Sequence, residues 1–158
     1  MIYINGRFLI NNPTGIENFA YGMCKAMLEK GIKFIILTPK SAIRSYDVIG
    51  FDMIKIGLFT GPLWEQIDLS FFMIGKSRDI LISFSGAGSL IIKNQIITIH
   101  DVAVFQHPEW FSKTYSILYK TITPIIARKS KAILTVSEFS KREITNLFGI
   151  NSDKVIVT

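Results

Sequence analysis

Short apolar runs alternate with amphipathic stretches along nearly the whole chain. Continuous apolar runs are typical of strands buried on both faces of a parallel sheet, whereas apolar positions three and four residues apart are typical of helices. The pattern therefore predicts helices that begin near residues 14, 63, 112 and 137, and strands at 2–4, 33–38, 53–56, 80–84, 95–99, 132–136 and 154–157.

Local signals fix the ends of some of these helices. Thr14 and Glu17 have the spacing of a capping box, which predicts that the first long helix begins at Thr14. Gly31 stands where a left-handed residue ends that helix. Pro124 lies inside the third helical pattern and lacks the N–H that a helix needs, so we expect this helix to kink or end near Thr123.

The alternation of strands and helices with short connections predicts the fold class. Parallel strands need crossover helices, and right-handed crossovers in both directions cover both faces of the sheet. We therefore expect an α/β fold with a Rossmann-like doubly wound parallel sheet. A length of 158 residues predicts a single domain over 1–158.

Composition excludes several classes of protein. A hydrophobic fraction of 49% with 19% charged residues is incompatible with disorder, and the single cysteine excludes a disulfide framework. No apolar stretch approaches the length of a membrane span, and the first residues lack the order of a signal peptide. The net charge of +6 suits phosphate-bearing ligands, an anionic membrane face or solubility alone. The basic residues are scattered, so no nucleic-acid partner is expected.

Four loops with unusual residues follow predicted strands. They are 12–16, 85–89, His100–Asp101 and Ser137–Glu138. Open parallel sheets bind ligands at the carboxyl ends of their strands, and these loops share that edge. Their convergence is a stronger indication of a binding site than any one motif.

Thr14–Gly15 is the first candidate within this edge. The N-terminus of a helix offers free N–H groups and a favourable dipole to an anion, so this turn is suited to phosphate. Spacing alone favours the simpler interpretation, which is a capped helix that begins with a permissive glycine. Neither G-x-G-x-x-G after the first strand nor a P-loop is present.

His100–Asp101 gives the sharper chemical signal. An imidazole and a carboxylate just past a buried strand can transfer protons or orient a hydroxyl near neutral pH. His107 precedes a proline and is interpreted as structural or exposed. The ligand spacing of a zinc centre and the G-x-S-x-G elbow of a hydrolase are both missing, so neither a metal site nor a serine triad is expected. Cys24 falls on an apolar helix face, as a buried structural thiol would.

The same residues carry a resemblance to a known family. The segments that match are Ile4–Phe8, Pro13–Ile16, His100–Val102, His107–Phe111, Ala132–Ile144 and Asp153–Val157, with Tyr115 and Tyr119 between them. Together they resemble family-4 glycosyltransferases of the GT-B fold, in particular the mannosyl- and rhamnosyltransferase-like members. The stretch Thr135–Ser140 is its most specific part.

The resemblance implies a function and an assignment of residues. Enzymes of this family have two Rossmann-like domains, and the N-terminal one binds the acceptor. Transfer from a nucleotide-sugar retains the anomeric configuration without a metal or other cofactor. By matching position, His100 and Asp101 would lie near the acceptor hydroxyl and the reacting sugar. Thr14 and Gly15 would approach the donor phosphates. Ser137 and Glu138 would line the cleft.

The chain departs from the family pattern at its end. It stops at Thr158, so the C-terminal domain that binds most of the nucleotide-sugar is expected to be missing, and the chain alone to be weakly active or inactive. Exposed apolar pairs would then meet a partner domain or a lipid-linked acceptor. The candidates are Leu58–Phe59, Leu63–Trp64, Val102–Phe105 and Trp110–Phe111.

Three hypotheses follow. The first is the acceptor-binding half of a retaining glycosyltransferase in surface polysaccharide synthesis, cytoplasmic or peripheral at the inner membrane face. It acts on a glycan or lipid-linked acceptor together with a partner chain or domain. The second is a non-catalytic module that docks onto an enzyme or membrane complex. The third, a flavodoxin-like nucleotide binder, is disfavoured because a phosphate-binding glycine fingerprint is missing.

Overall fold

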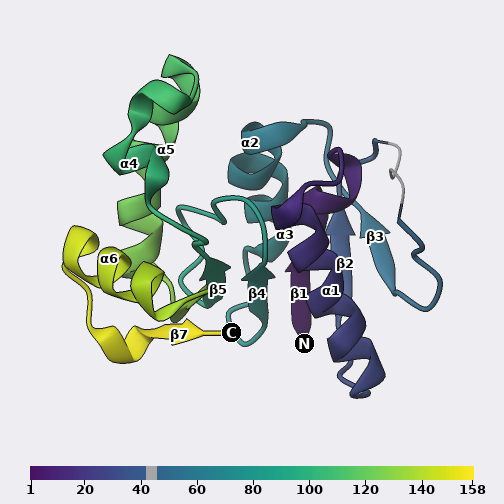
Figure 1. The fold of residues 1–158 in the computed structure, drawn as a ribbon. Helices are drawn as coiled ribbons and strands as arrows, with labels where there is room; N and C mark the ends of the chain where they lie inside the picture. Colours follow the sequence, from purple (N-terminus) through teal and green to yellow (C-terminus); the bar gives the residue numbers. More distant parts are fainter. Residues whose placement is uncertain (42–45) are drawn as a thin grey trace.

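A parallel sheet forms the centre of the molecule (Figure 1). The computed structural model describes residues 1–41 and 46–158. Within them, seven strands take the order β3-β2-β1-β4-β5-β6-β7, all parallel. Their bounds are β1 Ile2–Asn5, β2 Ile35–Thr38, β3 Met53–Lys55, β4 Ile80–Ser83, β5 Gln95–Thr98, β6 Ala132–Thr135 and β7 Val155–Val157. Each predicted strand is confirmed, within about two residues at its ends.

Helical segments connect the strands. The longer ones are α1 Gly15–Glu29, α5 Lys113–Lys129 and α6 Glu138–Phe148. Shorter ones are α2 Gly61–Trp64, the π-helical turn η2 Glu65–Leu69, α3 Ser70–Met73 and α4 Ala103–Gln106. Three 3-10 turns are η1 Gly6–Ile10, η3 Pro108–Trp110 and η4 Ser152–Lys154. The α2–η2–α3 run confirms the helix expected to begin near residue 63.

Alternate residues along the strands pack on opposite faces of the sheet. Ile4, Ile36 and Ile82 pack with α1, whose Ala20 and Cys24 are fully buried. Their chain neighbours Tyr3, Leu37 and Leu81 pack against Trp64 and Leu69 on the other face. Further along the sheet, Ile97 of β5 and Ile133 of β6 pack against Ile126 and Phe148. Helices cover both faces, so the doubly wound α/β class is confirmed.

The first helix begins as predicted but without the capping box. Thr14 is its N-cap, yet its side chain makes no bond to a backbone N–H of the first turn. The hydroxyl instead donates to the Glu17 carboxylate, which also accepts a bond from Asn11 Nδ2 at 3.1 Å. The carboxylate therefore draws the hydroxyl away from the capping position. At the other end, Gly31 has φ +69°, and the N–H of Ile32 donates to Met27 O, as in a Schellman ending.

A kink or an end was expected near Thr123, and the structure excludes the end. The helix continues to Lys129, with Pro124 inside it. Ile126 and Ala127, just beyond the proline, are fully buried in the core around β5 and β6. Burial of this apolar turn stabilises the helical path enough to offset the hydrogen bond that Pro124 cannot donate.

The exposed apolar pairs are only partly as expected. Leu58 is 84% exposed, and Phe59, Leu63, Trp110 and Phe111 are also exposed. Trp64 is fully buried, because its indole N–H donates to Ile56 O at 3.0 Å while its ring packs between β2 and α3. Val102 and Val104 are also buried, and Val102 packs in the core cluster with Ile122 and Ile126 of α5. No described helix is long and apolar enough to cross a membrane.

Candidate active site

The chain reverses its direction across the sheet between β1 and β4. Strands β2 and β3 extend the sheet to one side of β1, and β5 to β7 extend it from β4 to the other. Ligands of open parallel sheets bind at the carboxyl ends of strands near such a switch point. The first half of α5 and the short α2 rise above this edge (Figure 1).

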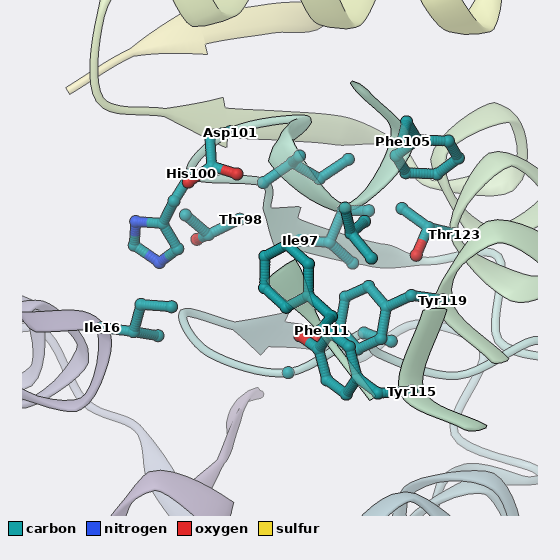
Figure 2. A pocket seen from close by; sticks show the side chains of 14 residues that line it. Ile16, Ile97, Thr98, His100, Asp101, Phe105, Phe111, Tyr115, Tyr119 and Thr123 are labelled. Atoms are coloured by element: carbon teal, nitrogen blue, oxygen red, sulfur yellow. The ribbon is translucent and has the colours of Figure 1, made fainter. Parts of the chain in front are cut away.

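A cavity of about 140 Å³ lies at this edge, beside β5 (Figure 2). Its floor comes from the end of β5 and from the loop after β4, and its outer wall comes from α4, Phe111 and α5. Ile16, the residue after Gly15, closes it from the side of α1. The lining residues are Ile16, Gly86, Ala87, Ile97–Asp101, Val104, Phe105, Phe111, Tyr115, Tyr119 and Thr123.

His100 lies at the mouth of this cavity. Its Nε2 is 3.3 Å from Phe84 O, and its ring meets the edge of Phe19 at 5.1 Å between centroids. A carbonyl only accepts hydrogen bonds, so Nε2 carries the proton and Nδ1 remains an acceptor. Burial lowers the pKa of His100, against smaller opposing effects of the Phe84 bond, Asp101 and Glu17. The imidazole is therefore neutral near pH 7 and can accept a hydrogen bond from a hydroxyl.

Asp101 lies beside His100 but points the other way (Figure 2). Its Oδ1 accepts a bond from the Ala103 N–H at 2.9 Å, which orders the turn into α4. The side chain is exposed. His100 and Asp101 thus both line the cavity without forming a dyad, and each offers a separate polar contact to a ligand.

The other predicted site residues divide between two places. Gly15 begins α1 next to Ile16, and a Cβ built on it would meet no atom within 4 Å, so the backbone there is open to a ligand. Thr14 is occupied by its bond to Glu17. Ser137 caps α6 by accepting a bond from the Ser140 N–H at 3.0 Å, and Glu138 is exposed in the first turn. Neither Ser137 nor Glu138 lines the cavity.

An aromatic ladder forms the wall that sequence reasoning did not assign to the site. Phe111 stacks on Tyr115 at 5.6 Å between centroids, and Tyr115 stacks on Tyr119 at 4.4 Å. Tyr115 is 39% exposed and lines the cavity together with Tyr119. Burial raises the pKa of Tyr119, so its hydroxyl stays protonated. The signal in the sequence was the spacing of Phe111, Tyr115 and Tyr119, because residues four apart lie next to each other on one face of a helix.

Two buried hydroxyls of the cavity lack partners. Thr98 and Thr123 are each 5% exposed, and within the described part of the chain neither Oγ1 has a hydrogen-bond partner. Both residues line the cavity. An unsatisfied buried hydroxyl costs about 1–3 kcal/mol, so a bound polar group that reached them would recover that free energy.

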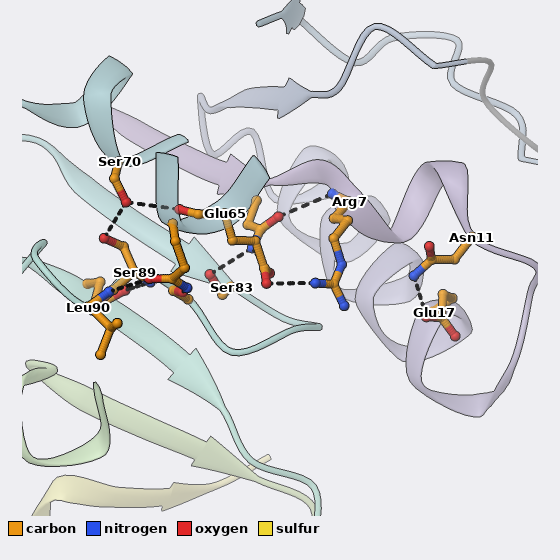
Figure 3. Close-up of polar contacts among 12 residues, drawn as sticks. Arg7, Asn11, Glu17, Glu65, Ser70, Ser83, Ser89 and Leu90 are labelled. Atoms are coloured by element: carbon orange, nitrogen blue, oxygen red, sulfur yellow. Dashed lines mark hydrogen bonds and ion pairs between the residues drawn. The ribbon is translucent and has the colours of Figure 1, made fainter. Parts of the chain in front are cut away.

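A second cluster of polar side chains lies at the switch point between β1 and β4 (Figure 3). The Arg7 Nη1 donates to Glu65 Oε2 at 2.6 Å, and Asn5 Nδ2 donates to Glu65 Oε1 at 2.7 Å. Ser70 Oγ donates to Glu65 O and bonds Ser89 Oγ at 2.7 Å. Sequence reasoning missed this network, because its members are far apart in the chain and match no motif.

The described residues hold no group of three His, Cys, Asp or Glu side chains suited to a metal ion. The polar atoms of the cavity are hydroxyls, one imidazole and one carboxylate. Such a set is suited to binding the hydroxyls of a sugar.

Comparison with known proteins identifies the family. The family model described as Glycosyltransferase Family 4 matches residues 13–158. O-antigen chain mannosyltransferase RfbU of Salmonella typhimurium is 28% identical over 67 residues, and O-antigen chain mannosyltransferase B of Escherichia coli is 31% identical over 67 residues. Each match covers 42% of this chain and 18% of the relative. Since the family model spans nearly the whole chain, the chain belongs to glycosyltransferase family 4 and has the fold of one Rossmann-like half of a GT-B enzyme.

Proposed function

We propose that the chain is the acceptor-binding half of a retaining glycosyltransferase. It positions a hydroxyl of a glycan or lipid-linked acceptor for transfer of a sugar from a nucleotide-sugar, without a metal. The observation that carries this proposal is the cavity at the carboxyl edge, with His100 and Asp101 at its mouth. Its place is where an open parallel sheet binds ligands.

The side chains of the cavity support this chemistry. Neutral His100 can accept a hydrogen bond from the attacking hydroxyl through Nδ1, while Phe84 O fixes its ring. Asp101 has a second carboxylate oxygen for a sugar hydroxyl. The Tyr115–Tyr119 stack gives a flat apolar wall for one face of a sugar ring. The exposed start of α1 at Gly15 is open to the donor phosphates.

A second domain or subunit completes the enzyme in this proposal. The cavity is partly open to solvent. Fixing two substrates relative to each other supplies much of the rate enhancement of a transferase. The names of the two relatives favour a role in surface polysaccharide synthesis. The net charge of +6 favours a cytoplasmic protein that contacts the inner membrane face.

A transfer assay tests this function. The protein is isolated with its partners from its source, and intact masses identify any further domain or subunit. The preparation is then given nucleotide-sugars and a glycan acceptor in the presence of a chelator. We expect a product with the anomeric configuration of the donor. Inversion, or dependence on a divalent metal, would contradict the mechanism, and absence of transfer would contradict the function.

The alternative is a non-catalytic docking module, which the exposed Leu58, Phe59 and Leu63 favour. Replacement of Leu58 and Leu63 by serine separates the two functions. A docking module would lose its partner in co-isolation while His100→Ala left transfer by the complex unchanged. For the acceptor-binding half, His100→Ala lowers transfer by at least about tenfold.

A further inference from the structure

The guanidinium of Arg7 follows β1 at the switch point (Figure 3). Its side chain is 16% exposed, and Nη1 donates to Glu65 Oε2 at 2.6 Å. A guanidinium has five N–H donors in a planar fork. Within residues 1–41 and 46–158, the bond to Glu65 is the only hydrogen bond that the guanidinium makes. Most of its donors are therefore available at the carboxyl edge of the sheet.

Glu65 holds this guanidinium in place. It is 1% exposed and begins the π-helical turn η2, a type of turn that is frequent at functional sites. Asn5 fixes the carboxylate from β1 and also accepts a bond from the Arg7 backbone N–H at 3.2 Å. The side chain and the backbone of Arg7 are thus anchored to the same strand end, so the direction of the fork is set before any ligand binds.

The ion pair lies directly behind the wall of the cavity. Gly86 lines the cavity with φ +79°, and a Cβ built on it would stand 2.1 Å from Glu65 Oε1. Tyr119, on the opposite wall, is near enough for its pKa to respond to both charges, although burial is the main cause of its rise. Glu65 therefore lies behind one wall of the cavity with Arg7 bonded to it, and Arg7 itself is outside the cavity lining.

Stability alone gives little reason to bury this pair. Replacing a buried ion pair by apolar residues of similar volume is often neutral or stabilising. The fork of arginine matches phosphate oxygens, and bonds between the two are charge-assisted. An anionic ligand at the end of β1 would satisfy donors that the protein leaves free.

We propose that Arg7 is an anion-binding residue of this cleft and that its ligand is a phosphate ester. The inference rests on the proposed function, because a nucleotide-sugar and a lipid-linked acceptor both carry phosphate. It adds a binding residue at the end of β1, away from the start of α1 where Gly15 is expected to meet phosphate.

Calorimetric titration of the full-length protein tests this inference with two probes, a nucleoside diphosphate and a short-chain prenyl diphosphate. Arg7→Gln alone would leave Glu65 buried without its partner, so Arg7→Gln/Glu65→Gln is compared with Glu65→Gln. Arg7→Lys, which keeps the charge but loses the fork, serves as a second variant should the double variant not fold. The exposed Arg78→Gln is the matched control.

We expect Arg78→Gln to bind like the wild type, and the double variant to bind at least about tenfold more weakly than Glu65→Gln. Arg7→Lys should weaken binding by several-fold. Loss with the nucleoside probe assigns the phosphate to the donor, and loss with the prenyl probe assigns it to the acceptor. Equal affinity of the double variant and Glu65→Gln, unchanged affinity of Arg7→Lys, or no binding of either probe to the wild type would overturn the inference.

The transfer assay described above separates this inference from the proposed function. Phosphate binding that depends on Arg7 in a protein without transferase activity would uphold the inference and overturn the function. Sugar transfer by a protein whose affinity for phosphate does not change when Arg7 is replaced would uphold the function and overturn the inference.

Discussion

The two sides of the carboxyl edge are built differently. At the ends of β1 and β4, Asn5, Glu65, Ser70 and Ser89 are joined in one hydrogen-bonded network, and among the described residues only Ser85 Oγ just after β4 is buried there without a partner. At the end of β5, Thr98 and Thr123 line a cavity, and their buried hydroxyls have no hydrogen-bond partner among the described residues. Paired polar groups rigidify a fold, whereas unpaired ones at a cavity cost stability until a ligand or water meets them.

We call the network of Asn5, Arg7, Glu65, Ser70 and Ser89 the frame, because its side chains are paired with one another. The cavity beside β5 is the binding surface. The loop after β4 belongs to both, since Gln66 Nε2 bonds Gly88 O at 2.7 Å on the frame side while Gly86 and Ala87 line the cavity. The π-helical turn that carries Glu65 and Gln66 therefore holds one wall of the cavity in position. Substitutions in the frame should cost stability, and those in the cavity should affect ligand binding.

The largest effect is expected for Glu65→Ala. This change leaves the mostly buried Arg7 without its carboxylate and should lower the free energy of unfolding by about 3–5 kcal/mol. Urea denaturation measures it, with Glu138→Ala as control because Glu138 is exposed at the start of α6. A loss no greater than that of the control would show that the network does not act as a frame.

Removal of a hydroxyl should change the free energy of unfolding differently in the network than at the cavity. Ser70→Ala removes bonds to Glu65 O and Ser89 Oγ and should cost about 1–3 kcal/mol. Thr98→Val and Thr123→Val replace unpaired hydroxyls by methyl groups and should leave stability unchanged or slightly higher. Acceptor binding by the two valine variants should weaken nevertheless. Equal destabilisation by all three changes would remove the distinction between frame and cavity.

The pH dependence of stability isolates His100. Because burial lowers its pKa in the folded protein, the unfolded chain binds a proton at higher pH than the folded chain does. The stability contributed by neutral His100 is therefore complete well above pH 6.5 and is lost as the pH falls through 6.5 toward the lowered value. Between pH 8 and pH 5.5, the free energy of unfolding should fall less for His100→Gln than for the wild type. The same slope for His100→Gln and the wild type would contradict this assignment.

The smallest change concerns Cys24, which lies in the core behind α1. Burial raises the pKa of its thiol to about 12, so it stays protonated at pH 8. We expect no alkylation by iodoacetamide in the folded protein and complete alkylation in urea, as measured by intact mass. Fast alkylation of the folded protein would mean that the α1 side of the sheet opens readily.

The sequence predicted what depends on local pattern. Apolar runs located the strands, and Gly31 and Gly149 end α1 and α6 with positive φ. Competition between neighbours was less predictable, since the Glu17 carboxylate takes the hydroxyl of Thr14 and core packing carries α5 through Pro124. The network of Arg7 and Glu65 joins residues 58 apart, and no local pattern indicates such a pair.

The candidate site was predicted in outline only. His100 and Asp101 lie at the cavity because strand ends meet at one edge, a rule that sequence alone can apply. Ser137 follows the same rule but caps α6 instead, since its hydroxyl has a free N–H beside it. The aromatic wall depends on how α5 leans over the sheet, which helical periodicity does not determine.

The central claim is that the cavity at the end of β5 serves sugar transfer. Its most direct test compares His100→Ala and Asp101→Asn with the matched pair His107→Ala and Glu109→Gln, whose side chains are exposed and lie outside this cavity. The complete enzyme, with its partner domain or subunit, is assayed for sugar transfer at saturating donor. We predict that each of the first two variants loses at least about tenfold in kcat/KM for the acceptor while both controls keep wild-type activity. Unchanged transfer by His100→Ala and Asp101→Asn would contradict the account.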